Sequence, residues 1–156
     1  MKIIKLTQGK YAIVDDEDFE YLNQWKWSCA KGTRYAASRI NNKIVYMHRL
    51  LMNPSKGKQI DHINNNGLDN RRENLRIATD SENKFNHKLI KTNKTGYHGV
   101  YWDLQMKKWG VGISLNGKHK ALGYFLTKEE AALAYNDAAK KYRGEFAQLN
   151  QIGETI

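Results

Sequence analysis

The sequence predicts an α+β protein in which short antiparallel strands alternate with helices. Short segments that alternate apolar and polar residues are separated by turns rich in Gly and Asn, as in β-hairpins. Two segments, beginning at Thr79 and Thr127, carry the Thr-x-x-Glu pattern that caps the start of a helix. The C-terminal part combines three strand patterns with one alanine-rich helical pattern, which predicts a three-stranded antiparallel sheet packed on one long helix.

Composition favours a folded, basic protein. The chain has 156 residues, enough for one ordinary domain or two or three very small ones, and 40% of them are hydrophobic. The formal net charge is +10, which favours a polyanionic partner, most often nucleic acid. Basic residues occur along the whole chain, so we expect a continuous basic surface instead of a detachable tail.

Cysteine and hydropathy patterns exclude several classes of protein. Cys29 is the single cysteine, so one chain can form neither a disulfide framework nor a multi-cysteine zinc site. No apolar run reaches the length of a membrane span, and the N-terminal residues lack the features of a signal peptide. We expect a protein that works in the cytoplasm and has no membrane partner.

Residues 1–55 are expected to form a small α+β unit. "KIIKLT" and "YAIV" predict a hairpin with Gly9 in its turn, and "DDEDFEYLNQW" predicts a helix with acidic residues in its first turn. "KWSCA", "RYAASRI" and "KIVYMH" are strand candidates, and "HRLLM" begins a short helix that Pro54 ends. Trp25 and Trp27 have two interpretations, a small core or a surface for stacking on bases.

Residues 56–90 predict the order strand, loop, strand, helix. The strands lie at 59–64 and 74–78, and the polar loop "NNGLDNRRE" between them has Gly67 at its bend. The capping pattern of Thr79 and Glu82 opens the helix. Residues 91–96 show no apolar periodicity and predict a linker.

Residues 97–150 predict the sheet and its long helix. The strand patterns are "GVYWDL", "KWGVGISL" and "HKALGYFL", joined by "QMK" and "NGK" turns in which Asn116-Gly117 is a hairpin signal. The helix begins after Thr127 and stops at Gly144. Three large apolar side chains are assigned to the core: Trp109, Leu122 and Phe125.

The polar run from 59 to 88 has the chemistry of a site. Asp61 and His62 are adjacent on a strand and point to opposite faces, whereas Asn83 and His87 share one face of the predicted helix. If the helix packs across the hairpin, one of the adjacent pair can reach a metal held with Asn83 while the other faces a reacting atom. Asp61 with Asn83 suits Mg²⁺ or Mn²⁺, and inclusion of His87 favours another transition metal. A histidine beside the ion is a candidate general base, and the alternative is a purely structural polar loop.

The run also resembles a known motif. "DH" at 61–62, with Asn74 thirteen and Asn83 twenty-two residues after Asp61, is similar to the HNH nuclease motif, above all in phage and intron-encoded homing endonucleases. The resemblance implies a ββα-metal fold with His62 as the general base and with Asp61 and Asn83 as metal ligands. It also implies that Asn74 ties the loop and orients the base.

Several neighbouring residues have open roles. His87 could be a metal ligand, a phosphate contact or neither. His48, which precedes the motif, could lie close to the site or serve in packing. The three arginines of the run are expected to contact phosphate, with solvated charges as the alternative: Arg71, Arg72 and Arg76.

The C-terminal segment resembles the plant ethylene-response-factor DNA-binding domain of the APETALA family. The resemblance rests on "GVYW", "KKWGVGI", "LGYF", "TKEEAALAYNDAAKKYRG" and "LN", and it implies a sheet laid in the major groove. The implied groove-facing residues are His98, Tyr101, Asp103, Ser114 and His119. The implied phosphate contacts are Lys107, Lys108, Lys118 and Lys120. Family members carry arginines at several groove positions, so a plant-like GC-rich target is not expected.

These features predict a site-specific, divalent-metal-dependent DNA endonuclease of the HNH homing type. It would hydrolyse phosphodiester bonds, nick as a monomer and use one Mg²⁺ or Mn²⁺ ion without a small-molecule cofactor. The expected partner is double-stranded DNA in a bacterial or phage-infected cell. The alternative is a DNA-binding regulator with an inert motif. An RNA-binding module is less favoured, because no RNP-type aromatic strand motif is present.

Overall fold

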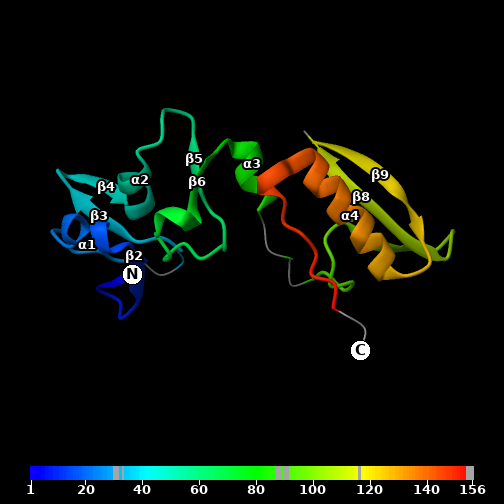
Figure 1. The fold of residues 1–156 in the computed structure, drawn as a ribbon, viewed down its shortest axis with the longest axis horizontal. Coiled ribbons are helices and arrows are strands. Elements are labelled where there is room, and N and C mark those ends of the chain that lie inside the picture. Colours follow the sequence, from blue (N-terminus) through cyan, green and yellow to red (C-terminus); the bar gives the residue numbers. More distant parts are fainter. Residues whose placement is uncertain (30–31, 33, 87–88, 90–91, 116, 154–156) are drawn as a thin grey trace. The chain divides into compact units, whose positions relative to one another are not determined.

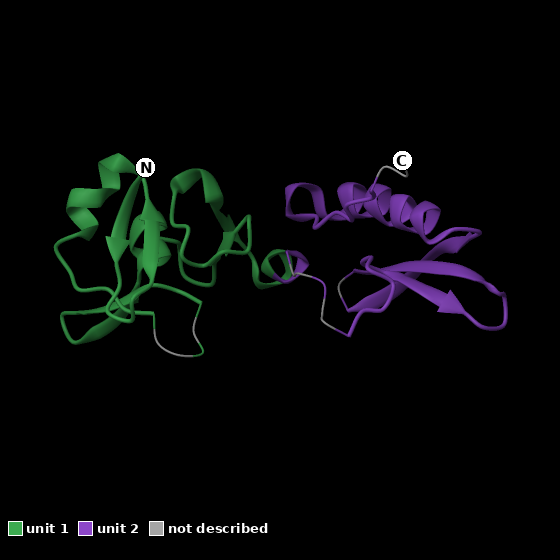
Figure 2. Ribbon diagram, turned by 90° about the horizontal axis from the view of Figure 1, so that it is seen from below, with its two compact units in different colours: residues 1–83 green, residues 84–156 purple. Residues whose placement is uncertain are grey.

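The structure is a computed structural model that describes residues 1–29, 32, 34–86, 89, 92–115 and 117–153 (Figure 1). It confirms the α+β prediction, because small antiparallel sheets alternate with helices along the chain. The chain divides into two compact units, residues 1–83 and residues 84–156 (Figure 2). Each unit has its own cluster of buried apolar side chains. Within the described residues, no helix is both long enough and apolar enough to cross a membrane.

The first unit is built from hairpins and short helices. Its antiparallel pairs are β1 (Lys2–Lys5) with β2 (Tyr11–Val14), β3 (Ala37–Ile40) with β4 (Lys43–Tyr46), and β5 (Gln59–His62) with β6 (Leu75–Ala78). Its helices are α1 (Asp16–Leu22), α2 (Met47–Met52) and the 3₁₀ turn η1 (Arg72–Asn74). Helix α3 (Asp80–Phe85) follows β6.

One hydrophobic core includes side chains of the β1–β2 and β5–β6 hairpins, together with Ala36 and Met47, which flank the β3–β4 hairpin. Leu22, Trp27 and Met47 are buried in it, and Ile60 and Leu75 reach it from the β5–β6 hairpin. The indole N–H of Trp27 donates to the carbonyl of Leu22 at 2.7 Å, so the buried ring leaves no unsatisfied donor. The core assignment of Trp27 is therefore confirmed, and the hairpin that carries Asp61 and His62 is fixed to the segment before it. A division near residue 55 and a linker over 91–96 stay predictions.

The second unit has the predicted sheet and helix. Strands β7 (Val100–Asp103), β8 (Lys108–Leu115) and β9 (Lys118–Phe125) pair in that order, and α4 (Lys128–Arg143) is followed by the 3₁₀ turn η2 (Gly144–Phe146). Thr127 and Glu130 form the predicted capping box. Side chains alternate along each strand, so Val111 and Ile113 of β8 pack in the core with α4, whereas Ser114 lies on the opposite, open face.

The hairpin turns and helix starts of the described residues lie where the sequence predicts them, but three details differ from the predictions. "KWSCA" forms no strand, because Trp27 and Cys29 are drawn into the core and an isolated bridge from Ser28 to Ala37 is the pairing there. The strand predicted through "KIVYMH" ends at Tyr46, since α2 begins at Met47. The strands predicted over 59–64 and 74–78 are shorter in the structure, because β5 ends at His62 and Asn74 belongs to η1. Asn116 lies outside the described residues.

Candidate active site

Strand β5 delivers both Asp61 and His62 to the site. In the antiparallel pairing with β6, Asp61 lies opposite Arg76 and His62 lies opposite Leu75. Both polar side chains are only 5% exposed. A buried carboxylate and a buried imidazole each require compensating partners, and these partners define the site.

His62 lies in an aromatic enclosure. The ring of Tyr35 stacks on its imidazole with centroids 5.5 Å apart, and the ring of His48 meets it edge-on at 5.1 Å. Burial lowers the pKa of His62 below its usual range, while the side chain of Asn70 and the carboxylates of Asp61 and Asp69 act in the opposite direction. A histidine that is neutral near pH 7 can accept a proton, which is the requirement for a general base.

His48 belongs to the same enclosure. It comes from α2, stacks on Tyr46 at 5.8 Å and contacts Tyr35 at 4.8 Å. Burial, with smaller contributions from the neighbouring His62 and Arg49, lowers its pKa to about 3. His48 is therefore a neutral ring that packs against His62, and a role for it in the site stays a prediction.

Asp61 forms an ion pair across the hairpin. Nε and Nη2 of Arg76 donate to Oδ2 of Asp61 at 2.8 and 2.6 Å. The guanidinium is itself mostly buried, with its side chain 12% exposed. Arg76 thus neutralises a buried carboxylate, and its contact with phosphate stays a prediction.

Asn74 ties the loop between β5 and β6 into one conformation. Its Nδ2 donates to the carbonyl of Asp69 at 2.8 Å and to Oδ1 of Asn64 at 3.0 Å. Its Oδ1 accepts the backbone N–H of Asn64 at 3.0 Å. The side chain of Asn64 also donates to Asp69 at 2.8 Å. One buried amide therefore closes the loop directly after His62.

Gly67 allows this loop to approach the aromatic enclosure. A Cβ at this position would collide with the carbonyl oxygen of Arg34 and would lie 2.7 Å from Cδ1 of Tyr35. Close packing, and not a positive φ, is the reason for glycine here. The loop consequently rests against the residue that stacks on His62.

The other two arginines of the run also contact carboxylates. Arg71 binds Asp69 through Nε at 2.8 Å and Nη2 at 2.7 Å, which lowers the pKa of that carboxyl. Arg72 binds Asp18 of α1 in the same two-pronged way at 2.8 and 2.7 Å. Two-pronged pairs of this kind fix geometry. They anchor the loop at both sides, and phosphate contact by these arginines stays a prediction.

The residues implied as metal ligands carry oxygen donors, which suit a hard cation. Asp61 offers a carboxylate and Asn83, on α3, offers an amide oxygen, which suits Mg²⁺ or Mn²⁺ completed by water and phosphate. Among the residues that the structure describes, no hydrogen bond joins Asn83 to Asp61, and no group of three His, Cys, Asp or Glu side chains gathers. His87 lies outside the described residues.

In the second unit, four of the five implied groove-facing residues share the open face of the sheet. The register places Tyr101 beside Gly110, Asp103 beside Lys108, and Ser114 beside His119. A Cβ at Gly110 would lie 2.5 Å from Cζ of Tyr101, so that ring lies across the strand. The rings of Tyr101 and His119 thus cover the two glycines of β8 on this face, Gly110 and Gly112.

The remaining candidates of this unit are distributed differently. His98 is the fifth implied groove residue, but its ring stacks on Tyr135 of α4 at 6.1 Å. Lys120 turns to the helix side, where its ammonium donates to the hydroxyl of Tyr142 at 2.7 Å. Three lysines are exposed at the sheet: Lys107, Lys108 and Lys118.

Sequence reasoning missed the aromatic enclosure. Tyr35 and Tyr46 contact the two histidines but belong to strand-like segments with no polar motif. Tyr46 stands two residues before His48, a weak local signal, whereas nothing local marks Tyr35. Its contact with His62 spans 27 positions of the chain and exists only after folding.

Three comparisons relate the chain to known proteins. A family model described as HNH endonuclease matches residues 45–85. The chain is 30% identical over 151 residues to an uncharacterized HNH endonuclease of Acanthamoeba polyphaga mimivirus. This alignment covers 93% of this chain and 77% of that protein. It is 32% identical over 94 residues to Protein 3.8 of Escherichia phage T7, covering 60% of this chain and 77% of that protein. No solved structure matches significantly. Since the family match contains the whole β5–β6–α3 segment and the similarity to the mimivirus protein runs through both units, the chain belongs to the HNH endonuclease family.

Proposed function

We propose that the protein is a site-specific, divalent-metal-dependent DNA endonuclease of the homing type. The single observation that carries this proposal is the position of His62, buried against Tyr35 and His48 and adjacent to the carboxylate of Asp61. A histidine with a lowered pKa beside a buried carboxylate can take a proton from water at neutral pH. The family assignment supports hydrolysis of a phosphodiester as the reaction that uses this proton transfer.

In this mechanism an imidazole nitrogen of His62 removes a proton from the water that attacks phosphorus. Tyr35 and His48 hold the imidazole ring by contact on two sides, and Asn74 fixes the loop that follows it. Asp61 and Asn83 would hold one Mg²⁺ or Mn²⁺ ion, which when bound stabilises charge on the phosphate and on the departing 3′ oxygen. The products would carry 5′-phosphate and 3′-hydroxyl ends.

The second unit supplies DNA readout in this proposal. Its open sheet face carries Tyr101, Asp103, Ser114 and His119 on one side of a three-stranded sheet, an element that the major groove can admit. A fragment of residues 96–156 should then protect a specific duplex from chemical footprinting without cutting it. If that fragment protects nothing that the intact protein protects, the sheet is not the reader.

A single active site cuts one strand at each encounter, so the monomer should nick double-stranded DNA. Incubation of the protein with supercoiled plasmid and Mg²⁺ or Mn²⁺ should give nicked circles, and EDTA should prevent them. Nicks that map to one position after primer extension support site-specific cleavage. Intact plasmid in the presence of every divalent ion tested would reject the proposal.

One observation favours the alternative of a non-cleaving DNA-binding regulator. Arg76 already pairs with the carboxylate that would hold the metal ion. A regulator should bind a specific duplex and leave plasmid uncut with any divalent ion, so the same plasmid assay, combined with a binding measurement, separates the two functions.

A further inference from the structure

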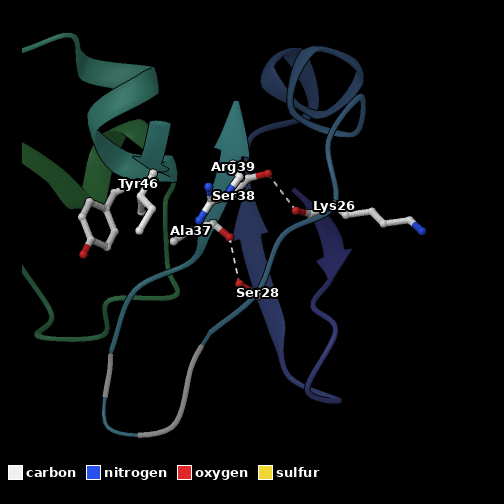
Figure 3. A pocket seen from close by; sticks show the side chains of 7 residues that line it. Lys26, Ser28, Ala37, Ser38, Arg39 and Tyr46 are labelled. Carbon is white, nitrogen blue, oxygen red and sulfur yellow. Dashed lines mark hydrogen bonds between the residues drawn. The ribbon is translucent and has the colours of Figure 1, made fainter. Parts of the chain in front are cut away.

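The β3–β4 hairpin presents one face as an open pocket. Antiparallel pairing puts Ala37 opposite Tyr46 and Arg39 opposite Ile44, so these four side chains share that face. Together with Lys26, Ser28 and Ser38 they line a pocket of about 330 Å³ (Figure 3). This volume falls at the lower end of the range of small-ligand sites.

The lining has a particular chemistry. It contains no acidic residue, and Arg39 has no carboxylate partner among the described residues, in contrast to Arg71, Arg72 and Arg76. Figure 3 shows the side chain of Lys26 directed away from the other lining residues, which leaves Arg39 as the cation of the pocket. An exposed guanidinium without an internal partner is free to bind phosphate.

Apolar surface accompanies this cation. Ile44 is 66% exposed and Tyr46 is 37% exposed, although both belong to a strand that could have buried them. Exposed apolar side chains beside a cation match a nucleotide unit, whose phosphate is anionic and whose sugar and base offer apolar faces.

The pocket is joined to the candidate active site by ring contacts. The ring of Tyr46 stacks on His48 with an interplanar angle of 19°, and His48 meets His62 edge-on. A strand of nucleic acid bound at His62 would therefore have its neighbouring nucleotides near the β3–β4 hairpin.

We propose that this pocket is a subsite for a nucleotide of the DNA strand that flanks the cleaved phosphate. Arg39 binds the phosphate of that nucleotide, and Ile44 and Tyr46 contact its sugar or base. The inference rests on the proposed function, since it places the pocket on the path of a DNA substrate.

The test uses the full-length protein and a matched pair of variants. Arg39→Gln and Lys43→Gln each remove one positive charge from the same hairpin, but Lys43 pairs with Ile40 and lies on the opposite face. Affinity for a fluorescently labelled random-sequence duplex is measured in EDTA at several salt concentrations. Arg39→Gln should weaken binding roughly five- to tenfold and reduce the slope of log K against log salt by about 0.9, the loss of one phosphate contact. Lys43→Gln should change affinity less than twofold.

A second measurement separates this proposal from the nuclease proposal. Single-turnover nicking of plasmid by Arg39→Gln should require more protein for half-maximal rate but reach the wild-type maximum, because Arg39 does not touch the reacting atoms. If wild-type protein binds and nicks DNA while Arg39→Gln and Lys43→Gln behave alike in both measurements, the subsite is refuted and the nuclease stands. If binding depends on Arg39 and no nick forms, the subsite as a nucleotide contact is supported and the nuclease proposal fails.

Discussion

The phenol ring of Tyr35 is stacked on the imidazole of His62, with ring centroids 5.5 Å apart and an interplanar angle of 27°. The same phenol ring packs against the loop at Gly67 and against His48. Tyr35 lies before the segment that the family model matches. The orientation of the candidate general base therefore depends on a residue outside the motif.

Replacement of Tyr35 should affect the rate of cleavage and not DNA affinity. Tyr35→Leu removes the stacked ring and should lower the maximal nicking rate roughly 10- to 100-fold, because misplacement of a reacting group by about 1 Å can cost about 10²-fold. Tyr35→Phe keeps the ring and should retain most of the rate. Single-turnover kinetics and duplex affinity measure the two effects, and wild-type rates in a folded Tyr35→Leu protein would contradict this role.

Protonation of His48 should destabilise the first unit at low pH. The folded-state pKa of His48, about 3, lies below the unfolded value near 6.5, so the unfolded state binds more protons between these values. His48 therefore does not reduce the free energy of unfolding above pH 6.5, but it reduces it increasingly as the pH falls toward 3. His48→Phe should show a shallower loss of unfolding free energy over that range, measured by urea denaturation. Parallel pH dependences for the two proteins would show that His48 is not the titrating group.

Asn74 should be a stability residue as well as a positioning residue. Asn74→Ala leaves the N–H of Asn64 and the carbonyl of Asp69 without their partners and should cost roughly 2–4 kcal/mol of unfolding free energy. The control is Gln24→Ala, an exposed position that should change stability by less than about 0.5 kcal/mol. Equal stabilities for the two variants would mean that Asn74 does not tie the loop.

Removal of either implied ligand should raise the requirement for divalent metal. Asp61→Asn and Asn83→Ala should each increase the Mg²⁺ or Mn²⁺ concentration for half-maximal nicking about tenfold or more, since even supporting residues of a metal site cost about 10- to 100-fold in affinity. Asn83→His should shift the preference toward softer ions. His87→Ala should have a smaller effect, and if it alone eliminated the response to metal, the ligands would have been assigned wrongly.

Local signals in the sequence were sufficient for much of the fold. The capping box of Thr79 and Glu82 fixes the start of α3, with Thr79 N–H donating to the Glu82 carboxylate at 2.7 Å. The second box, at Thr127, does the same for α4. Such signals involve residues three positions apart, so they can be recognised without knowledge of the tertiary fold.

Long-range partners could not be predicted in this way. No local pattern indicates that the guanidinium of Arg72 binds Asp18, 54 positions earlier, and its contact with phosphate stays a prediction. "KWSCA" alternates like a strand, yet Trp27 and Cys29 enter the core and leave only an isolated bridge at Ser28. In both cases the outcome depends on which segments meet in space, and the local pattern does not contain that information.

The most direct test of the account is the nicking rate of His62→Ala compared with its duplex affinity. Loss of a general base should lower the rate by roughly 10²–10⁴-fold. Duplex affinity should stay within a few-fold, because the proposed phosphate and base contacts lie elsewhere. Near wild-type nicking by a folded His62→Ala protein would contradict the assignment of His62 as the base.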